Sequence, residues 1–248
     1  MLFYVVIILV GLCLGSFLNV VIYRLPLMII HEPTQFNLCF PRSHCPYCQQ
    51  TIAWRYNIPI VSYCYLKGRC HTCQQPIAKT YLIVEILTTL CAALLAWRFG
   101  FSITFVAVMI FIGFLIPLTI IDLQYQLLPD HLTLPLLWIG LLINTQAVFT
   151  PLSSAVWGVM LGYSCLWLIY WMFKLITGKE GLGYGDFKLL AALGAWLGWM
   201  SLLIVLVLAS LVGALVGIIL LIKGHPRDKP IPFGPFLCAA GFIVLLLD

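Results

Sequence analysis

The chain has 248 residues, of which 63% are hydrophobic and only 8% are charged. Apolar runs of roughly 17 to 25 residues alternate with short polar gaps, a pattern typical of helices that cross a lipid bilayer. A soluble core of this size would not need so many apolar residues, and the composition therefore excludes an ordinary soluble domain.

Eight transmembrane helices are predicted. They fall at residues 1–23, 81–97, 102–121, 132–149, 154–176, 187–200, 202–222 and 231–247. The first has no basic residues before its apolar stretch and no small-residue cleavage pattern, so we expect a retained span and not a signal peptide. The sequence thus predicts an all-α polytopic membrane protein in three parts: the first helix (1–23), a polar domain (24–80) and a transmembrane domain (81–248).

The basic residues predict the orientation in the membrane. With eight spans, twelve of the 13 Lys and Arg residues fall on one side and only Arg98 on the other. Cytoplasmic loops carry the excess of Lys and Arg, so we expect residues 24–80 in the cytoplasm and both termini outside. Topology accounts for the formal charge of +5. We therefore expect contact with membrane lipid and no nucleic-acid partner, since nucleic-acid binding needs that charge on one exposed face.

Two C-x-x-C pairs lie in the polar stretch: Cys45 with Cys48, and Cys70 with Cys73. Each pair can direct two thiolates at one point, and two such turns form the tetrahedral sulfur cage of a structural zinc ion. A small domain with few large apolar residues needs such a staple. Disulfides are the alternative, but the cytoplasm keeps thiols reduced. We predict zinc bound by these four cysteines; residues nearby that could replace a ligand are Cys39, His44, Cys64 and His71.

Four acidic residues lie outside polar loops and need an explanation. Glu85 lies near the start of a predicted helix, where the helix dipole favours a carboxylate. Asp130 follows a proline and precedes a helix, which is typical of an N-cap. Asp186, in GLGYGDFK, fits the same interpretation equally well.

Asp122 cannot be explained by a position at the start of a helix. It lies at the cytoplasmic end of its predicted span, where the helix dipole disfavours a carboxylate. Ionisable groups at membrane depth usually face a bundle interior and have a function. The predicted topology places Asp122 and Asp186 at the same boundary, and two facing carboxylates can share a proton and activate water. Gly183 and Gly185 would let an extended peptide approach. A proton-coupled transporter and a zinc-bearing membrane scaffold are the alternative classes.

Five motifs in order resemble one known family. They are GSFLNVVIYRLP at 15–26, the CPYC and CHTC pairs with NIPIVS between them, IDLQYQLLPDHLTLPLLW at 121–138, GYGDFKLLAALGAWLG from 183, and PFGP at 232–235. Together they cover nearly the whole chain and look like the type IV prepilin peptidases. These are polytopic aspartic proteases of the bacterial inner membrane, of the GxGD type.

The resemblance implies that Asp122 and Asp186 are the catalytic pair. It also implies prepilin and pseudopilin substrates, cleavage after a glycine, and methylation of the new N-terminal residue, usually phenylalanine, by S-adenosylmethionine.

No Rossmann fingerprint for the methyl donor is present, so its site must be unusual. Candidates are Gly15, Asn19 and Gly68. Gly11 and Gly15 could instead form a G-x-x-x-G contact with another helix, and Asn19 could form a hydrogen bond across helices. A peptidase without methyltransferase activity, whose zinc domain is structural, remains the alternative.

Overall fold

The protein is described by a computed structural model that covers residues 2–31, 37–179, 181–224 and 231–247. Its internal contacts divide the chain into two compact units, Met1–Pro117 and Leu118–Asp248. In the described residues the regular elements are all helices, so the predicted all-α fold is confirmed. The division falls inside one helix, at Pro117, where a proline interrupts the backbone hydrogen bonds.

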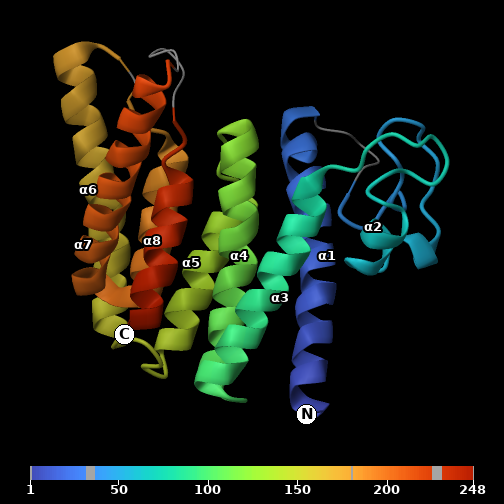
Figure 1. The fold of residues 1–248 in the computed structure, drawn as a ribbon. Coiled ribbons are helices and arrows are strands. Elements are labelled where there is room, and N and C mark those ends of the chain that lie inside the picture. Colours follow the sequence, from blue (N-terminus) through green and yellow to red (C-terminus); the bar gives the residue numbers. More distant parts are fainter. Residues whose placement is uncertain (1, 32–36, 180, 225–230, 248) are drawn as a thin grey trace. The chain divides into compact units, whose positions relative to one another are not determined.

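The first unit is built on two helices that lie side by side, α1 (Leu2–His31) and α3 (Lys79–Phe99) (Figure 1). They pack in opposite directions, because Gly15 of α1 contacts the backbone of Glu85 while Gly11 contacts that of Thr89. A glycine at each crossing lets the two backbones approach closely. The first helix continues past Pro26 to His31, so it is longer than the predicted span 1–23.

The polar segment between these helices contains only two short helical elements, η1 (Trp54–Tyr56) and α2 (Val61–Tyr65). Two buried charged side chains attach its loops to the long helices. Arg24 of α1 donates hydrogen bonds to the carbonyl oxygens of the 37–41 loop, and Glu85 of α3 accepts one from the backbone N–H of Ile60. The segment therefore depends on polar contacts with the two helices.

The second unit contains the end of α4 (Ile103–Tyr125) and four further helices, α5 (Asp130–Asn144), α6 (Leu152–Thr177), α7 (Tyr184–Ile222) and α8 (Gly234–Leu247). The closest packing joins α6 to the first half of α7. There the backbones of Gly158 and Gly194 touch, and Gly162 lies against the backbone of Leu190. Any side chain at these glycines would separate the helices.

Helix α7 is interrupted at Gly198, whose backbone (φ 78°, ψ 172°) is not helical. Before the interruption, Leu193 packs on Gly241 of α8; after it, Gly213 packs on Phe236 and Gly217 on Ile231. At the start of α7, Gly185 lies against Leu128, which also contacts Gly234, the first residue of α8. Residue numbers therefore rise together along α8 and the first half of α7, and they run in opposite senses along α8 and the second half. The two halves run in opposite directions.

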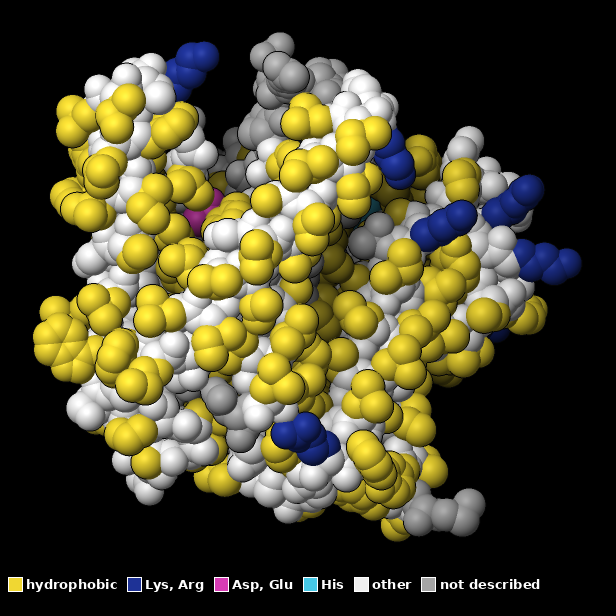
Figure 2. Space-filling model, turned by 60° about the vertical axis from the view of Figure 1, so that its left-hand side comes forward, with side chains coloured by type: hydrophobic (Ala, Val, Ile, Leu, Met, Phe, Trp, Pro, Cys, Tyr) yellow, Lys and Arg dark blue, Asp and Glu magenta, His cyan; other side chains and the backbone are white. Residues whose placement is uncertain are grey.

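The reversal accounts for the predicted number of spans. Among the described residues, five helices are long and apolar enough to cross a membrane, and α5 and α8 are shorter apolar helices. Because α7 consists of two antiparallel halves, the seven elements provide the eight predicted segments. The sixth and seventh meet at Gly198 and not between residues 200 and 202. Hydrophobic side chains cover the sides of the helices (Figure 2), as expected of a multi-pass membrane protein.

Candidate active site and zinc site

Asp122 lies in the last turn of α4 and is buried, with only 5% of its surface exposed. Its Oδ2 accepts a hydrogen bond of 3.0 Å from the backbone N–H of Gly234, the first residue of α8. Only glycine fits there, because a Cβ on residue 234 would lie 2.6 Å from the same oxygen. Helix α8 therefore fixes the orientation of the carboxylate.

Asp186 lies in the first turn of α7 and is 8% exposed. Gly183 precedes the helix in an extended conformation, and its carbonyl oxygen accepts a hydrogen bond of 3.2 Å from the backbone N–H of Asp186. The Oδ1 atom of Asp186 is buried and has no hydrogen-bond partner among the described residues. Such an atom is costly in a folded protein and marks a place where a polar group is expected to bind.

The two carboxylates lie at the same end of the second unit. The side chain of Leu128 contacts both Gly185, next to Asp186, and Gly234, the partner of Asp122. The structure thus brings together the two aspartates that the sequence singled out. Gly234 was not recognised as part of the site, although the PFGP motif that contains it was visible.

Asp130 does not cap its helix as expected. It is the first residue of α5, its preceding N-cap position is Pro129, and no side chain caps the helix. Its carboxylate instead forms an ion pair with Lys188 of α7, at 2.7 Å. The prediction was wrong because the partner is 58 residues away in the sequence. The pair is partly exposed and is therefore worth little free energy.

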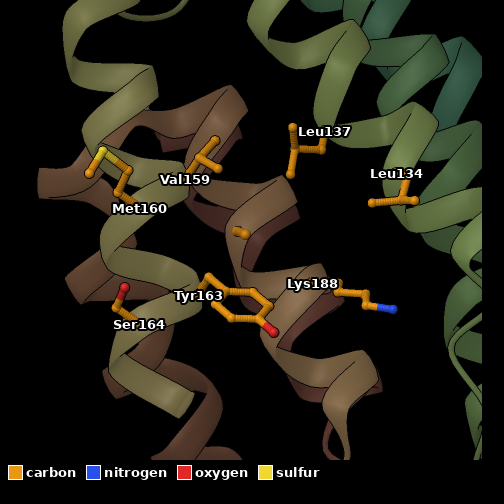
Figure 3. Close-up of a pocket in the computed structure, with 8 residues that line it drawn as sticks. Leu134, Leu137, Val159, Met160, Tyr163, Ser164 and Lys188 are labelled. Atoms are coloured by element: carbon orange, nitrogen blue, oxygen red, sulfur yellow. The ribbon is translucent and has the colours of Figure 1, made fainter. Parts of the chain in front are cut away.

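An apolar pocket of about 350 Å³ lies between α5, α6 and α7 (Figure 3). Most of its lining is apolar, and its polar members are Tyr163, Ser164 and Lys188. Lys188 is two residues after Asp186 on α7. The pocket can accept an apolar chain next to the first turn of α7.

The four predicted cysteine ligands converge in the polar segment. The Sγ atoms of Cys45, Cys48, Cys70 and Cys73 all lie within 4.8 Å of one another, and those of Cys45 and Cys73 are 3.8 Å apart. A tetrahedral zinc ion with bonds of about 2.3 Å places its sulfur ligands about 3.8 Å apart. The donor set and its spacing fit zinc. The possible substitutes Cys39, His44, Cys64 and His71 are not in the cluster.

Backbone hydrogen bonds in the second C-x-x-C turn favour the thiolate form of Cys70 and Cys73, but only Cys70 has a pKa below its ordinary value. The pKa of Cys70 is lowered to about 7, chiefly by hydrogen bonds from the backbone N–H groups of Cys73 and Thr72. A hydrogen bond from the backbone N–H of Gln75 lowers the pKa of Cys73. Burial and the neighbouring thiols outweigh this effect and raise the pKa of Cys73 to about 12. Four thiolates cannot coexist at this spacing without a cation to hold them.

The three candidate methyl-donor residues all have contacts within the first unit. Gly15 lies under α3, where a Cβ would be 2.8 Å from Cα of Glu85, and Asn19 donates a hydrogen bond of 3.0 Å to the carbonyl oxygen of Tyr81. Gly68 has a φ of +69° and lies against the ring of Tyr63. These contacts match the packing alternatives, and they do not test binding of the donor.

Comparison with known proteins gives the same family. The model of the bacterial peptidase A24 N-terminal domain matches residues 9–99, and that of the type IV leader peptidase family matches residues 109–218. Among curated proteins, the prepilin leader peptidase/N-methyltransferase of Aeromonas salmonicida is 49% identical, over 99% of this chain and 91% of that protein. The proteins of the same name from Pseudomonas aeruginosa and Legionella pneumophila are each 46% identical, over 96% and 98% of this chain and 88% and 90% of theirs. No solved structure matches.

Two buried aspartates at the ends of helices in a multi-pass helical membrane protein are the arrangement expected of an intramembrane aspartic protease. Within that class, this chain belongs to the type IV leader peptidase family. The resemblance seen in the sequence is confirmed.

Proposed function

We propose that this protein is a membrane aspartic endopeptidase that removes the leader peptides of type IV prepilins and type II secretion pseudopilins. Asp122 and Asp186 are the catalytic pair. The observation that carries the proposal is the position of these two buried side chains: they come from different helices whose ends both lie against Leu128, and one oxygen of Asp186 has no partner among the described residues.

The chemistry follows from one shared proton. One carboxylate, ionised, takes a proton from a water molecule, whose oxygen attacks the scissile carbonyl carbon. The other, protonated, donates to the carbonyl oxygen as the tetrahedral intermediate forms. The intermediate collapses when the first carboxyl gives the proton it took from water to the leaving amine, the carbon–nitrogen bond breaks, and the second carboxylate recovers its proton from the hydroxyl of the intermediate. The hydrogen bond from Gly234 holds Asp122 in place during these transfers.

We further propose that the site and the cysteine domain face the cytoplasm of the bacterial inner membrane. Twelve of the 13 Lys and Arg residues support this orientation. A prepilin has a basic leader at the cytoplasmic surface followed by an apolar helix, so its cleavage site lies at the depth of the aspartates. The apolar pocket beside α7 suits a few apolar side chains of such a helix.

The second activity is methylation of the new N-terminal amine, usually of phenylalanine, with S-adenosylmethionine as the methyl donor. The names of the three relatives support this part, since each is a prepilin leader peptidase/N-methyltransferase. Zinc at the four cysteines would hold the polar segment in one conformation. Gly15, Asn19 and Gly68 remain candidates for the donor site. The alternative is a peptidase whose cysteine domain has a structural role alone.

Membranes that contain the protein are incubated with a prepilin and S-adenosylmethionine labelled in its methyl group. We expect a shorter, labelled product from the parent, and no cleavage by Asp122→Asn or Asp186→Asn. Asp130→Asn is the matched control, because it removes a carboxylate outside the pair. Cleavage by either variant of the pair would contradict the proposed mechanism, and cleavage without label would support the alternative.

A further inference from the structure

Glu85 is a buried carboxylate in the first unit that the proteolytic mechanism does not use. It is 9% exposed, and its Oε2 accepts a hydrogen bond of 2.7 Å from the backbone N–H of Ile60. No cation pairs with it in the part of the chain that the structure describes. A buried charge without a counter-ion is costly, so this position favours a positively charged ligand.

The surroundings of Glu85 keep its carboxylate in place. Gly15 lets α1 and α3 approach each other at the level of Glu85. Asn19 donates a hydrogen bond to the carbonyl oxygen of Tyr81, which is one turn before Glu85 on α3. Ile60 has a φ of +59°, an unfavourable conformation for a branched residue. Strain of this kind persists where the surrounding structure requires it, here to direct the N–H of Ile60 at Glu85.

A second concave site begins at the residue after Ile60. The pocket has a volume of about 260 Å³ and is lined by Arg55, Tyr56, Val61, Ser62 and Tyr65. Ser62 fixes its wall, since its hydroxyl donates to the carbonyl of Arg55 and accepts from the backbone N–H of Ile58. The ring of Tyr56 stacks on His71, with centroids 4.6 Å apart. Tyr65, by contrast, is 76% exposed and presents a ring that a ligand can cover.

We propose that this pocket and Glu85 together bind the methyl donor, S-adenosylmethionine. The inference rests on the methyltransferase part of the proposed function. The ring of Tyr65 stacks on the adenine of the donor, as aromatic side chains stack on nucleobases. The guanidinium of Arg55 suits the donor's carboxylate, and the carboxylate of Glu85 suits its sulfonium. In this arrangement Gly15 and Asn19 are positioning residues that act through Glu85.

The assignment of charge to Glu85 makes a specific prediction about donor and product. Methyl transfer replaces the positive sulfonium of the donor by the neutral thioether of S-adenosylhomocysteine. A carboxylate beside the sulfur therefore strengthens binding of the donor more than binding of the product. The aromatic contact, in contrast, strengthens both equally.

The test is a comparison of dissociation constants for these two compounds, measured by calorimetry with the full chain in detergent. Glu85→Gln keeps an oxygen that can accept from Ile60 and removes the charge. We expect it to weaken donor binding about tenfold and product binding less than twofold. Tyr65→Ala should weaken both by about fivefold or more. The control is Trp54→Ala, an exposed aromatic residue of the same segment outside the pocket, which should change neither.

Zinc content and elution volume report the folding of each variant. A Glu85→Gln protein that keeps the parent's preference for the donor would overturn the proposal and leave Glu85 as an anchor for Ile60. In another outcome, the parent transfers methyl groups while Glu85→Gln and Tyr65→Ala bind the donor as tightly as the parent does. That result would refute the proposed site but not the methyltransferase function. A parent that cleaves prepilin but neither binds the donor nor transfers label would refute the methyltransferase function and this site together.

Discussion

The backbone N–H of Gly234 and the carboxylate of Asp122, 112 residues apart in the sequence, are joined by a hydrogen bond of 3.0 Å. The bond uses the first residue of α8 to hold the last turn of α4. An N–H at a helix start is one of the donors that have no partner within the helix, so it is available to a carboxylate. The position of Asp122 thus depends on a residue without a functional side chain.

Replacement of Gly234 by alanine is expected to impair cleavage without unfolding the protein. The added Cβ would lie 2.6 Å from Oδ2 of Asp122 and displace it. A misplacement of about 1 Å in a catalytic group lowers rates roughly a hundredfold. Prepilin cleavage rates in membranes measure the effect. Gly113→Ala on α4 is the control, since its Cβ meets nothing within 4 Å; equal rates for the two variants would contradict this role of Gly234.

Metal analysis should find one zinc ion per chain, bound by the four clustered cysteines. Cys70→Ser removes one ligand and is expected to lower zinc content and expose the segment around residues 42–78 to protease, because small metal domains fold only with their metal. Cys64→Ser provides the comparison: this cysteine lies in the same segment but outside the cluster. If Cys70→Ser kept its zinc, or Cys64→Ser lost it, the assignment of ligands would be incorrect.

Asn144 should contribute more to stability than its size suggests. Its side chain, 1% exposed, donates to the carbonyl oxygens of Ala195 and Trp196, just before the reversal at Gly198, where the helix cannot supply N–H partners. Its own oxygen accepts from the backbone N–H groups of Phe149 and Thr150. Removing these bonds leaves buried polar groups without partners.

We therefore expect Asn144→Ala to lower the free energy of unfolding by about 2–4 kcal/mol, on the basis of about 1–3 kcal/mol for each buried group left unpaired. Thermal unfolding in detergent measures this change. The adjacent exposed residue serves as the control, since Thr145→Ala loses only a local bond to the carbonyl of Leu142. Equal melting temperatures for the two variants would show that the reversal is stabilised in another way.

The contact between Gly158 of α6 and Gly194 of α7 should tolerate no side chain. A Cβ on Gly158 would overlap the backbone carbonyl of Gly194, which cannot move without shifting its helix. We expect Gly158→Ala to cost about 1–3 kcal/mol of stability, as overpacked cores do. It should also slow cleavage, because Asp186 begins the displaced helix. Ser153→Ala, exposed on the same helix, should melt and cleave like the parent; a Gly158→Ala protein that did so too would refute close packing here.

The sequence predicted the helices and the principal residues because their signals are local. Long apolar runs indicated the spans, the spacing of the C-x-x-C pairs indicated the cluster, and the helix dipole made Asp122 conspicuous. The grouping of the cysteines is observed, and so is the position of both aspartates beside residues that lie against Leu128. The catalytic roles of the aspartates remain predictions.

What the sequence could not predict depends on distant contacts. Asp130 looked like a cap because its partner, Lys188, lies on another helix. The hydrogen bond from Gly234 uses a backbone N–H, which every residue except proline has, so the sequence gives no sign of it. Glu85 was explained by the dipole of its own helix, although the structure shows a contact with Ile60 across a loop.

The single non-helical residue Gly198 determines how many times the most apolar part of the chain crosses the bilayer. If Tyr184–Ile222 were one continuous span, Thr177 and Lys223 would be on opposite faces of the membrane. Because the chain turns back at Gly198, the number of crossings becomes even, and both ends of this stretch return to the face where α7 begins. Reporter domains inserted after Gly178 and after Lys223 would therefore be found in the same compartment.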